Sequence, residues 1–367
     1  MPNPAKVPRH GSAQSTRSIC NTQMISAHSP RHKPSKRVGV AALVAVALAG
    51  GACSSSRPSE SEPWGGGATI VLPMPCDLVG CVGDGVDTSV GAYTLQDVDL
   101  LFPSGLFGLE MTRVYRSDRT EEGWLGAGWA TVYDTTLTDS AGKVTLTAPA
   151  GLAPRWRPEA PAGWSVTGDP KLSSTASGMK LAWPTGEHWS FASTGALVQM
   201  TSPYGQTIDI ERANGVPTVI RSSQEASITF TSLNGLVVKA DTTDGRSVSF
   251  EYDDQLLTGV IAPGASLTYS YNTDQLMTKR SGPDGKTTTG YENGFVTSQL
   301  QASGARIALA YQGDTTTVTS PTTLIYEHDS QGRLVKVTSN DQTVTVREYD
   351  KSGLLTEASD FVQPGQQ

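Results

Sequence analysis

The C-terminal half of the chain repeats itself about every 20 residues, and no other feature of the sequence limits the fold as strongly. From residue 191 onward, a ring or large apolar side chain recurs at intervals of 17 to 22 residues. The recurring residues are Phe191, Ile210, Phe230, Tyr252, Tyr271, Tyr291, Tyr311, His328 and Tyr349. A unit this short cannot bury its own apolar face, so successive units must pair with one another. The sequence therefore predicts a repeat architecture.

The clearest units have a Gly four residues after the ring residue and a Leu six residues after it. The pattern occurs in Phe191 with Gly195 and Leu197, His328-Asp329 with Gly332 and Leu334, and Tyr349-Asp350 with Gly353 and Leu355. This spacing is typical of a hairpin, in which the ring residue ends one strand, the polar residues and Gly form the turn, and Leu begins the return strand. Apolar and polar side chains alternate between the turns, as in residues 335–338 and 343–347. We expect an all-β fold, an antiparallel sheet of such hairpins, without a helix longer than about ten residues after residue 53.

The N-terminus has the features of an export signal. Residues 1–52 contain seven Lys and Arg and no acidic residue, and a basic stretch at 31–37 precedes an apolar run at 38–52. This arrangement predicts a secretion signal that starts at Met1 or Met24. The run of 15 residues is shorter than the roughly 20 that span a bilayer, which disfavours a permanent transmembrane helix.

The cysteines indicate a lipid anchor and a disulfide. Residues 50–53 (GGAC) resemble a bacterial lipobox, in which Cys53 is lipidated and anchors the mature protein to the membrane. The alternative is ordinary cleavage after residues 47–49 and an extracellular protein with a free Cys53. Since Cys20 leaves with the signal, Cys76 and Cys81 remain as a pair, and in an oxidising compartment we expect them to form a disulfide.

Composition divides the chain further. Residues 54–66 are rich in Ser, Pro and Gly, and all seven Trp lie between Trp64 and Trp189. We predict a signal peptide at 1–52, a flexible tether at 53–66, a head domain at 67–140, a connecting β-region at 141–190 and the repeat region at 191–360.

Several segments resemble one bacterial family. Residues 326–334 and 349–355 resemble the YD repeat of Rhs proteins, with His328 where that family usually has Tyr. Residues 83–91 (GDGVDTSVG) resemble the opening of the domain that heads many Rhs proteins, although Gly85 and Val90 depart from it. Residues 113–117 and 125–129 resemble its Arg-x-Tyr-x-Ser strand and Gly-x-Gly-Trp turn. The resemblance implies part of an Rhs-like β-shell with a small β-rich head domain.

In that family, long arrays wind into a hollow shell around a C-terminal toxin, and other members are surface or adhesion proteins. About eight units are present here, so we expect a short or truncated member. The resemblance implies a fold more than an activity. We expect a non-enzymatic scaffold or binding protein, exported and anchored to the cell envelope or extracellular, or else a fragment of a toxin-delivery shell.

The residues with reactive side chains favour a structural interpretation. His188 and His328 are the only histidines after residue 53, and neither has a nucleophile motif beside it. The acid pairs Glu121-Glu122 and Asp253-Asp254 have the composition of solvated turns. The chain therefore predicts no catalytic residue, no cofactor and no metal site, since two His and one Cys pair are too few for a typical zinc site.

The expected partners follow from charge and aromatic content. Residues 53–367 contain 21 basic and 35 acidic side chains, which disfavours nucleic acid. The apolar face of the sheet needs a cover, and another protein chain is one candidate. The alternative function is a carbohydrate-binding surface module that uses exposed Trp side chains between Trp124 and Trp189 to bind cell-surface polysaccharide.

Overall fold

A computed structural model describes residues 54–55, 68–71, 74–102, 108–140, 143–149, 171–350 and 355–360. All of them belong to one compact unit, Val44–Gly365, and only this unit is described below. The signal peptide, Cys53, most of the tether and Gly353 lie outside the described residues.

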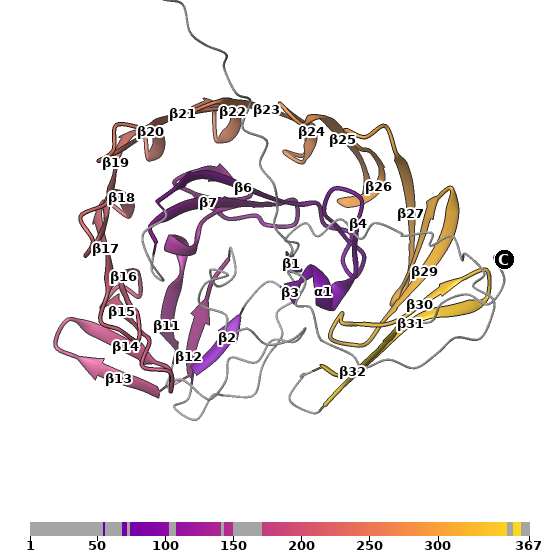
Figure 1. The fold of residues 1–367 in the computed structure, drawn as a ribbon, viewed down its shortest axis with the longest axis horizontal. Coiled ribbons are helices and arrows are strands. Elements are labelled where there is room, and N and C mark those ends of the chain that lie inside the picture. Colours follow the sequence, from indigo (N-terminus) through magenta and orange to yellow (C-terminus); the bar gives the residue numbers. More distant parts are fainter. Residues whose placement is uncertain are drawn as a thin grey trace, which may run out of the picture. The chain divides into compact units, whose positions relative to one another are not determined.

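The strands between Lys171 and Asp360 form a single antiparallel sheet of 20 strands, in which each strand pairs with the next along the chain. The sheet thus begins within the predicted connecting β-region and continues through the repeat region. Figure 1 shows that this sheet bends along its length, so that one of its faces is concave. The strands are β13 (Lys171–Thr175), β14 (Gly178–Ala182), β15 (His188–Ala192), β16 (Leu197–Thr201), β17 (Thr207–Ala213), β18 (Val216–Ser222), β19 (Ser227–Leu233), β20 (Leu236–Thr242), β21 (Ser247–Asp253), β22 (Leu256–Ala262), β23 (Ala265–Tyr271), β24 (Met277–Gly282), β25 (Gly285–Glu292), β26 (Phe295–Leu300), β27 (Arg306–Gln312), β28 (Thr315–Ser320), β29 (Thr322–His328), β30 (Leu334–Ser339), β31 (Gln342–Tyr349) and β32 (Leu355–Asp360). The prediction of an all-β hairpin sheet is confirmed.

The N-terminal strands form smaller sheets. Strands β10, β7 and β6 make one sheet, and β11, β12 and β2 make another. The N-terminal elements are β1 (Ser54–Ser55), β2 (Ala68–Val71), β3 (Met74–Pro75), α1 (Cys76–Val79), β4 (Cys81–Val82), β5 (Val86–Asp87), β6 (Thr94–Leu101), β7 (Glu110–Arg116), β8 (Glu122–Gly123), β9 (Gly126–Ala127), β10 (Trp129–Ala130), η2 (Val132–Asp134), β11 (Thr136–Ser140) and β12 (Lys143–Thr147). Among the described residues, α1 is the only α-helix, and no helix is long and apolar enough to cross a membrane.

A β-bulge recurs in the repeat sheet, immediately before the last or the last but one residue of the first strand of a hairpin. The residues that follow these bulges are Phe191, Arg212, Ser232, Tyr252, Tyr271, Tyr291, His328 and Tyr349. We call these residues, together with Tyr311 at the equivalent place in β27, the bulge ladder. Because a bulge bends its strand and increases its twist, repeated bulges give a physical cause for the curvature of the sheet.

A second series of side chains lies two residues before the bulge ladder and faces the concave side. This inner ladder consists of Trp189, Ile210, Phe230, Phe250, Tyr269, Thr289, Leu309 and Tyr326, all of which are buried. Ile210 and Phe230 therefore belong to the inner ladder, and the sequence-based assignment of both to the ring series is wrong by two residues. Side chains two residues apart in a strand face the same side. The inner ladder and the bulge ladder are therefore hard to tell apart from the sequence.

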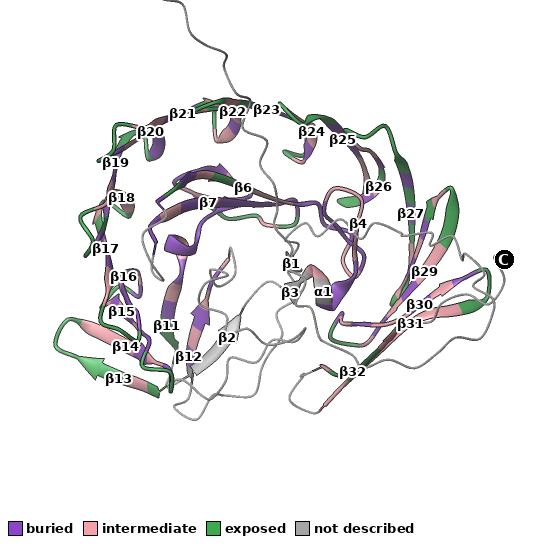
Figure 2. Ribbon diagram, in the orientation of Figure 1, coloured by how far each residue is buried: buried purple, intermediate pink, exposed green. Residues whose placement is uncertain are grey.

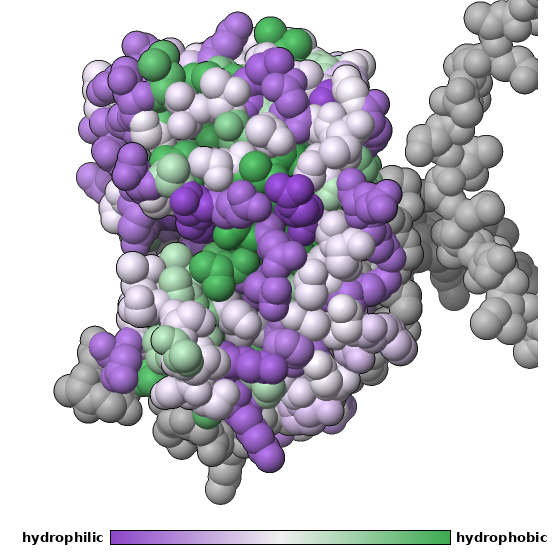
Figure 3. Space-filling model, turned by 90° about the vertical axis from the view of Figure 1, so that its left-hand side faces the viewer, coloured by the Kyte–Doolittle hydropathy of each residue, from purple (hydrophilic) through white to green (hydrophobic). Residues whose placement is uncertain are grey.

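The inner ladder and the N-terminal strands share one hydrophobic core. Tyr115, Trp129, Tyr133 and Leu137 of the N-terminal part are almost fully buried, and they pack in the same cluster as Trp189 and Phe230. Figure 2 shows buried residues on β7 and on the sheet strands that surround it. The outward face is different: Figure 3 shows it as mostly hydrophilic, with scattered hydrophobic side chains. The N-terminal strands thus cover the apolar face of the sheet.

Candidate functional site

The bulge ladder ties each hairpin to the hairpin before it. Each Tyr of the ladder donates a hydrogen bond from its hydroxyl group to a backbone carbonyl 14 or 15 residues earlier. The bonds join Tyr252 to Val237 (2.8 Å), Tyr271 to Leu257 (2.8 Å), Tyr291 to Met277 (2.8 Å), Tyr311 to Val296 (2.6 Å) and Tyr349 to Leu334 (2.9 Å). The ring residue of one unit is thereby bonded to the return strand of the previous unit.

The bulge explains why a hydroxyl group is needed at this place. The carbonyls that accept these bonds belong mainly to residues opposite the ladder of the previous hairpin, as in the pairs Ser232 with Val237 and Tyr252 with Leu257. A bulge disrupts the regular strand pairing there, and a buried carbonyl without a partner costs about 1–3 kcal/mol. The Tyr hydroxyl provides the missing donor. Burial raises the pKa of Tyr252 and Tyr271, so both stay protonated and able to donate.

His328 occupies the same ladder position with an imidazole ring. Its Nδ1 lies 3.1 Å from the Asp314 carbonyl, which replaces the bond that a Tyr would make. Its Nε2 lies 2.9 Å from the Val79 carbonyl at the end of α1 and 3.0 Å from Thr88 Oγ1. His328 therefore contacts both the preceding hairpin and the N-terminal part.

The N-terminal part provides acceptors for backbone amides opposite the bulges. The amides of Leu197, Val237 and Val296 donate to the carbonyls of Thr135 (3.2 Å), Trp124 (2.9 Å) and Gly91 (2.9 Å), and the Met277 amide donates to the Tyr115 hydroxyl (2.9 Å). In the intervening unit the corresponding residue is Pro217, which has no N–H. At Val237, Met277 and Val296, a Tyr hydroxyl of the sheet and an acceptor of the N-terminal part together satisfy the carbonyl and the amide opposite the bulge.

Opposite β21 to β24, the contact surface is aromatic and ionic. Trp129 packs against Tyr269 and Tyr115, with ring centroids 5.1 and 5.4 Å apart, and donates from Nε1 to the Tyr271 hydroxyl at 3.2 Å. The guanidinium of Arg113 lies 4.5 Å from the Trp129 ring centroid. These contacts bring β7 and β10 against the concave face.

Arg113 is fully buried and is held by two carboxylates of β6. It makes a bidentate ion pair with Asp99, and its Nη2 lies 3.9 Å from Asp97. Asp97 in turn accepts from the Tyr269 hydroxyl at 2.8 Å and from Arg280 at 3.0 Å, so the network crosses to β23 and β24. Burial lowers the pKa of Arg113, but the Asp99 carboxylate outweighs this effect and raises it well above its ordinary value. The cluster is a buried ionic link between the N-terminal strands and the sheet.

Opposite β25 to β28, hydrogen bonds to the loop at residues 83–91 replace the rings. Thr287 donates to the Asp84 carboxylate, Gln299 accepts from the Asp84 amide at 2.7 Å, and Thr316 donates to the Thr88 carbonyl. A Cβ atom on Gly83 would lie 2.3 Å from the Gln299 side chain, so this approach requires glycine. The GDGVD segment is therefore fitted closely to the sheet.

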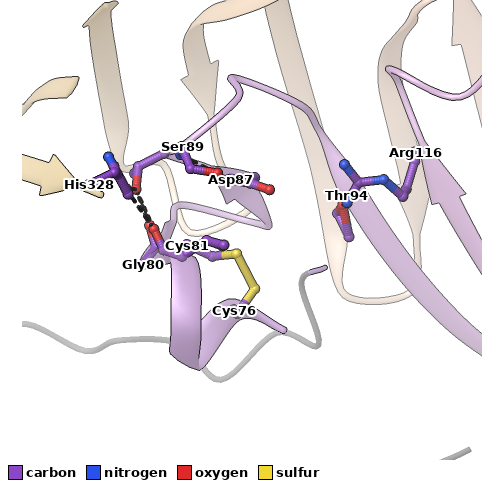
Figure 4. The surroundings of a disulfide bond; sticks show 10 residues. Cys76, Gly80, Cys81, Asp87, Ser89, Thr94, Arg116 and His328 are labelled. Atoms are coloured by element: carbon purple, nitrogen blue, oxygen red, sulfur yellow. Dashed lines mark hydrogen bonds between the residues drawn. A yellow bond between two sulfur atoms is a disulfide. The ribbon is translucent and has the colours of Figure 1, made fainter. Parts of the chain in front are cut away.

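A disulfide closes the segment immediately before this loop. Cys76 and Cys81 are joined, with Cα atoms 5.0 Å apart, around α1. Figure 4 shows the disulfide beside Gly80 and His328. The Thr88 hydroxyl lies 2.7 and 2.6 Å from the carbonyls of Val79 and Gly80, and Asp87 accepts from both the amide and the hydroxyl of Ser89. The short loop thus presents its carbonyls to the C-terminal hairpins.

Known families match two parts of the chain. Residues 83–154 match a family described as a domain of unknown function, DUF6531, and residues 328–362 match the family described as RHS Repeat. The predicted resemblance to Rhs/YD-repeat proteins is confirmed in these two segments. No curated protein matches this chain.

Solved structures offer only distant likeness. The Tc holotoxin pore of Photorhabdus luminescens is 11% identical, with a TM-score of 0.24, over 74% of this chain and 20% of the other. The crystal structure of TcdB2-TccC3-TEV is 15% identical, with a TM-score of 0.27, over 77% of this chain and 16% of the other. A porin-like protein from Bacteroides uniformis is 11% identical, with a TM-score of 0.19, over 52% and 86%. This chain thus spans about a fifth or less of the length of these two solved chains.

The residues that the sequence analysis singled out lie in the strands and turns of the sheet. Phe191 is buried opposite Leu197, and the Asp329 carboxylate accepts from the amides of Gln331 and Arg333 (both 2.9 Å) in the turn that contains Gly332. Asp350 is half-buried. His188 is half-buried on β15, with Nδ1 3.4 Å from the Gly186 carbonyl.

The structure buries several of the residues that a catalytic or sugar-stacking site could use. The Thr88 hydroxyl near His328 is fully buried, and Glu121, Glu122, Asp253 and Asp254 are exposed. Trp124, Trp129, Trp183 and Trp189 are at least nine-tenths buried, so none of them can stack on a sugar; the proposal of exposed Trp in this range is wrong for these four. Their rings are needed to fill the space between the N-terminal strands and the sheet. Trp64, Trp156 and Trp164 lie outside the described residues. Among the described residues, no group of three His, Cys, Asp or Glu side chains could hold a metal ion.

Sequence reasoning missed the residues that join the two parts, above all Arg113, Asp97 and Asp99. A signal was present: Asp97 and Asp99 alternate with Val98 and Leu100 in one strand, which places two carboxylates on one face. Their pairing with Arg113 and Arg280 depends on tertiary contacts that the repeat period does not contain.

Proposed function

We propose that this Rhs-repeat chain is a non-enzymatic scaffold, a segment of β-shell wall whose concave face is covered by its own N-terminal strands. The supporting observation is that both the backbone carbonyl and the backbone amide of residues opposite the bulges have hydrogen-bond partners. At Val237, Met277 and Val296, the carbonyl accepts from a Tyr hydroxyl of the sheet and the amide donates to an atom of the N-terminal part. These bonds hold the N-terminal strands against the sheet.

The non-enzymatic part of the proposal has a direct test. Purified protein should show no turnover on broad panels of esters, glycosides and peptides. Turnover that disappears in both His188→Ala and His328→Ala proteins would overturn it, because these are the only histidines available for acid–base chemistry after residue 53.

We also propose that the scaffold is exported and anchored through Cys53. The support is the order of basic stretch, apolar run and GGAC segment in residues 31–53. In producing cells, a clickable palmitate analogue should label the native protein and not the Cys53→Ser variant, which should leave the membrane fraction. Equal labelling of both proteins would contradict the anchor.

Finally, we propose that the scaffold contributes to a toxin-delivery shell, as the resemblance to Rhs arrays implies. The intact mass of the protein extracted from producing cells tests this. A mass well above that of residues 53–367 with lipid supports a longer shell, whereas a mass equal to it makes the chain a short scaffold for another protein or a surface polymer.

A further inference from the structure

Three hairpins of the sheet turn on the dipeptide Asn-Gly. The two strands of each hairpin pair up to the residues on either side of the dipeptide, so the turn has only two residues. All six turn residues are exposed. The three dipeptides are therefore equivalent sites that solvent reaches: Asn214-Gly215 between β17 and β18, Asn234-Gly235 between β19 and β20, and Asn293-Gly294 between β25 and β26.

The backbone of each dipeptide has the φ angles of a type I′ turn. The three Asn φ angles are 52°, 53° and 51°, and the Gly φ angles are 84°, 86° and 84°. In a type I′ turn the Asn ψ is about +30°, which directs the Gly amide nitrogen away from the Asn side chain. A flip of the Asn–Gly peptide plane gives a type II′ turn, in which ψ is about −120° and this nitrogen faces the side-chain carbon Cγ. Because type II′ is the other favoured turn of two-residue hairpins, the flip leaves the strands paired.

The surroundings of the turns leave room for this flip. A Cβ atom on Gly215, Gly235 or Gly294 would have nothing within 4 Å. The first turn is restrained in another way, because Arg212 donates from Nη1 to the Gly215 carbonyl at 3.0 Å. No side chain in the part of the chain that the structure describes bonds to Gly235 or Gly294 in this way. The second and third turns are therefore the freer ones.

We propose that Asn234 and Asn293 are sites of spontaneous deamidation in the folded protein, and that Asn214 reacts more slowly. The Gly amide nitrogen bonds to Cγ of the Asn, and the side-chain nitrogen leaves as ammonia with the proton of the attacking amide. This step closes a five-membered succinimide ring. Water then opens the ring at either carbonyl and gives Asp or isoaspartate, so the reaction consumes only water. Glycine favours the attack because it has no Cβ atom beside the nitrogen.

Deamidation changes both the charge and the length of the turn. Either product places a new carboxylate at the tip of the hairpin, and isoaspartate also adds a methylene group to the main chain. At Asn234 the change lies close to Val237, whose amide donates to the Trp124 carbonyl. A longer turn shifts the pairing of Leu233 with Leu236 and weakens this contact with the N-terminal part. The modification goes beyond the scaffold role and acts on one of its contacts.

The chain contains its own matched control. Asn340 also has a positive φ, 48°, in an exposed two-residue turn, but the next residue is Asp341, whose Cβ atom hinders the attack. Purified full-length protein is aged in mildly alkaline buffer and digested, and mass spectrometry gives the converted fraction at each Asn. Methylation by a protein isoaspartyl methyltransferase identifies the isoaspartate product. We expect Asn234 and Asn293 to react at least about tenfold faster than Asn340.

A variant and a urea series complete the test. Gly235→Asp copies the turn at 340–341, so it should stop the reaction at Asn234 and leave the rate at Asn293 unchanged. Urea below the unfolding transition should also leave both native rates unchanged, because the peptide flip needs no unfolding. The unfolded chain should react faster, since an L residue disfavours a φ of about +60° with a ψ of about −120°.

Three outcomes would overturn the proposal. These are equal rates at Asn340 and at the two Gly-linked sites, an unchanged rate at Asn234 in Gly235→Asp, or native rates that rise in proportion to the unfolded fraction as urea is added. Far-ultraviolet circular dichroism and thermal unfolding show that the variant retains the fold. The scaffold proposal is tested separately, because none of these results depends on whether the protein is an enzyme or where it is located.

Discussion

The sheet meets the N-terminal strands through two chemically different surfaces. Opposite β21 to β24, the inner ladder has the rings Phe250 and Tyr269, and the contact is made by Trp129 and the Arg113 cluster. Opposite β25 to β28, the same ladder place is taken by Thr289, and the contact is made by hydroxyls and amides against the 83–91 loop. The bulge ladder does not change in this way, since Tyr252, Tyr291 and Tyr311 all make the same bond. The repeat therefore keeps its backbone linkage constant and varies the side chains that face its partner.

The largest expected effect tests the aromatic and ionic surface. Arg113→Met removes a fully buried cation and leaves the Asp99 and Asp97 carboxylates without it, which should cost about 4 kcal/mol in the free energy of unfolding. Urea unfolding at pH 7 measures this. Arg246→Met is the control, since Arg246 is paired with an exposed Asp244 at the surface and should change stability far less. Equal effects of the two substitutions would mean that the buried cluster does not hold the N-terminal strands.

The next effect tests the hydrogen-bonded surface. Replacing both Cys76 and Cys81 by Ser should cost about 2 kcal/mol, because it removes a constraint on the unfolded chain. The loss should be accompanied by faster hydrogen exchange in β29 and β30, which α1 contacts through His328. The native protein treated with dithiothreitol should behave as the double variant. Loss of protection in β21 to β24 first would contradict the separation of the two surfaces.

A smaller effect tests the Tyr hydroxyl bonds of the bulge ladder, which occur along the whole sheet. Tyr252→Phe removes only the hydroxyl that bonds to the Val237 carbonyl and should cost about 1 kcal/mol. Tyr349→Phe, which breaks the corresponding bond to Leu334 at the other end of the sheet, should cost a similar amount. Urea unfolding of both variants makes the comparison. A cost near zero for both would show that the carbonyls find other partners.

The smallest effect is a pH dependence at the loop. Burial raises the pKa of Asp87 above its ordinary value of 3.8, against opposing effects of Arg116 and Ser89. The native state therefore holds this proton more tightly than the unfolded state, and the contribution of Asp87 to stability falls as pH rises through the raised pKa. Asp87→Asn should lack this fall, so its stability relative to the native protein should increase as pH rises above about 4. Unfolding at several pH values would contradict this if the difference stayed constant or decreased.

The sequence was informative about the repeat because the repeat depends on local chemistry. Tyr252, Tyr291 and the turn at Asp329 are visible as a 20-residue period with turn residues, and they make local or neighbouring contacts. Ile210 and Phe230 were assigned to the wrong position of the repeat, because the residues at the bulge, Arg212 and Ser232, have no ring. The buried Arg113 cluster and the role of the Trp residues could not be predicted, because they depend on which strand packs on which face of the sheet.

Hydrogen exchange of four backbone amides tests the central claim most directly. The N-terminal part completes the hydrogen bonding of the bulged hairpins at Leu197, Val237, Met277 and Val296. In the native protein these four amides should exchange at least about a thousandfold more slowly than unprotected amides, as slowly as amides between neighbouring strands. Exchange of all four within about tenfold of the unprotected rate, while the strand amides stay protected, would contradict it, because the N-terminal strands would then not be the partners of the sheet.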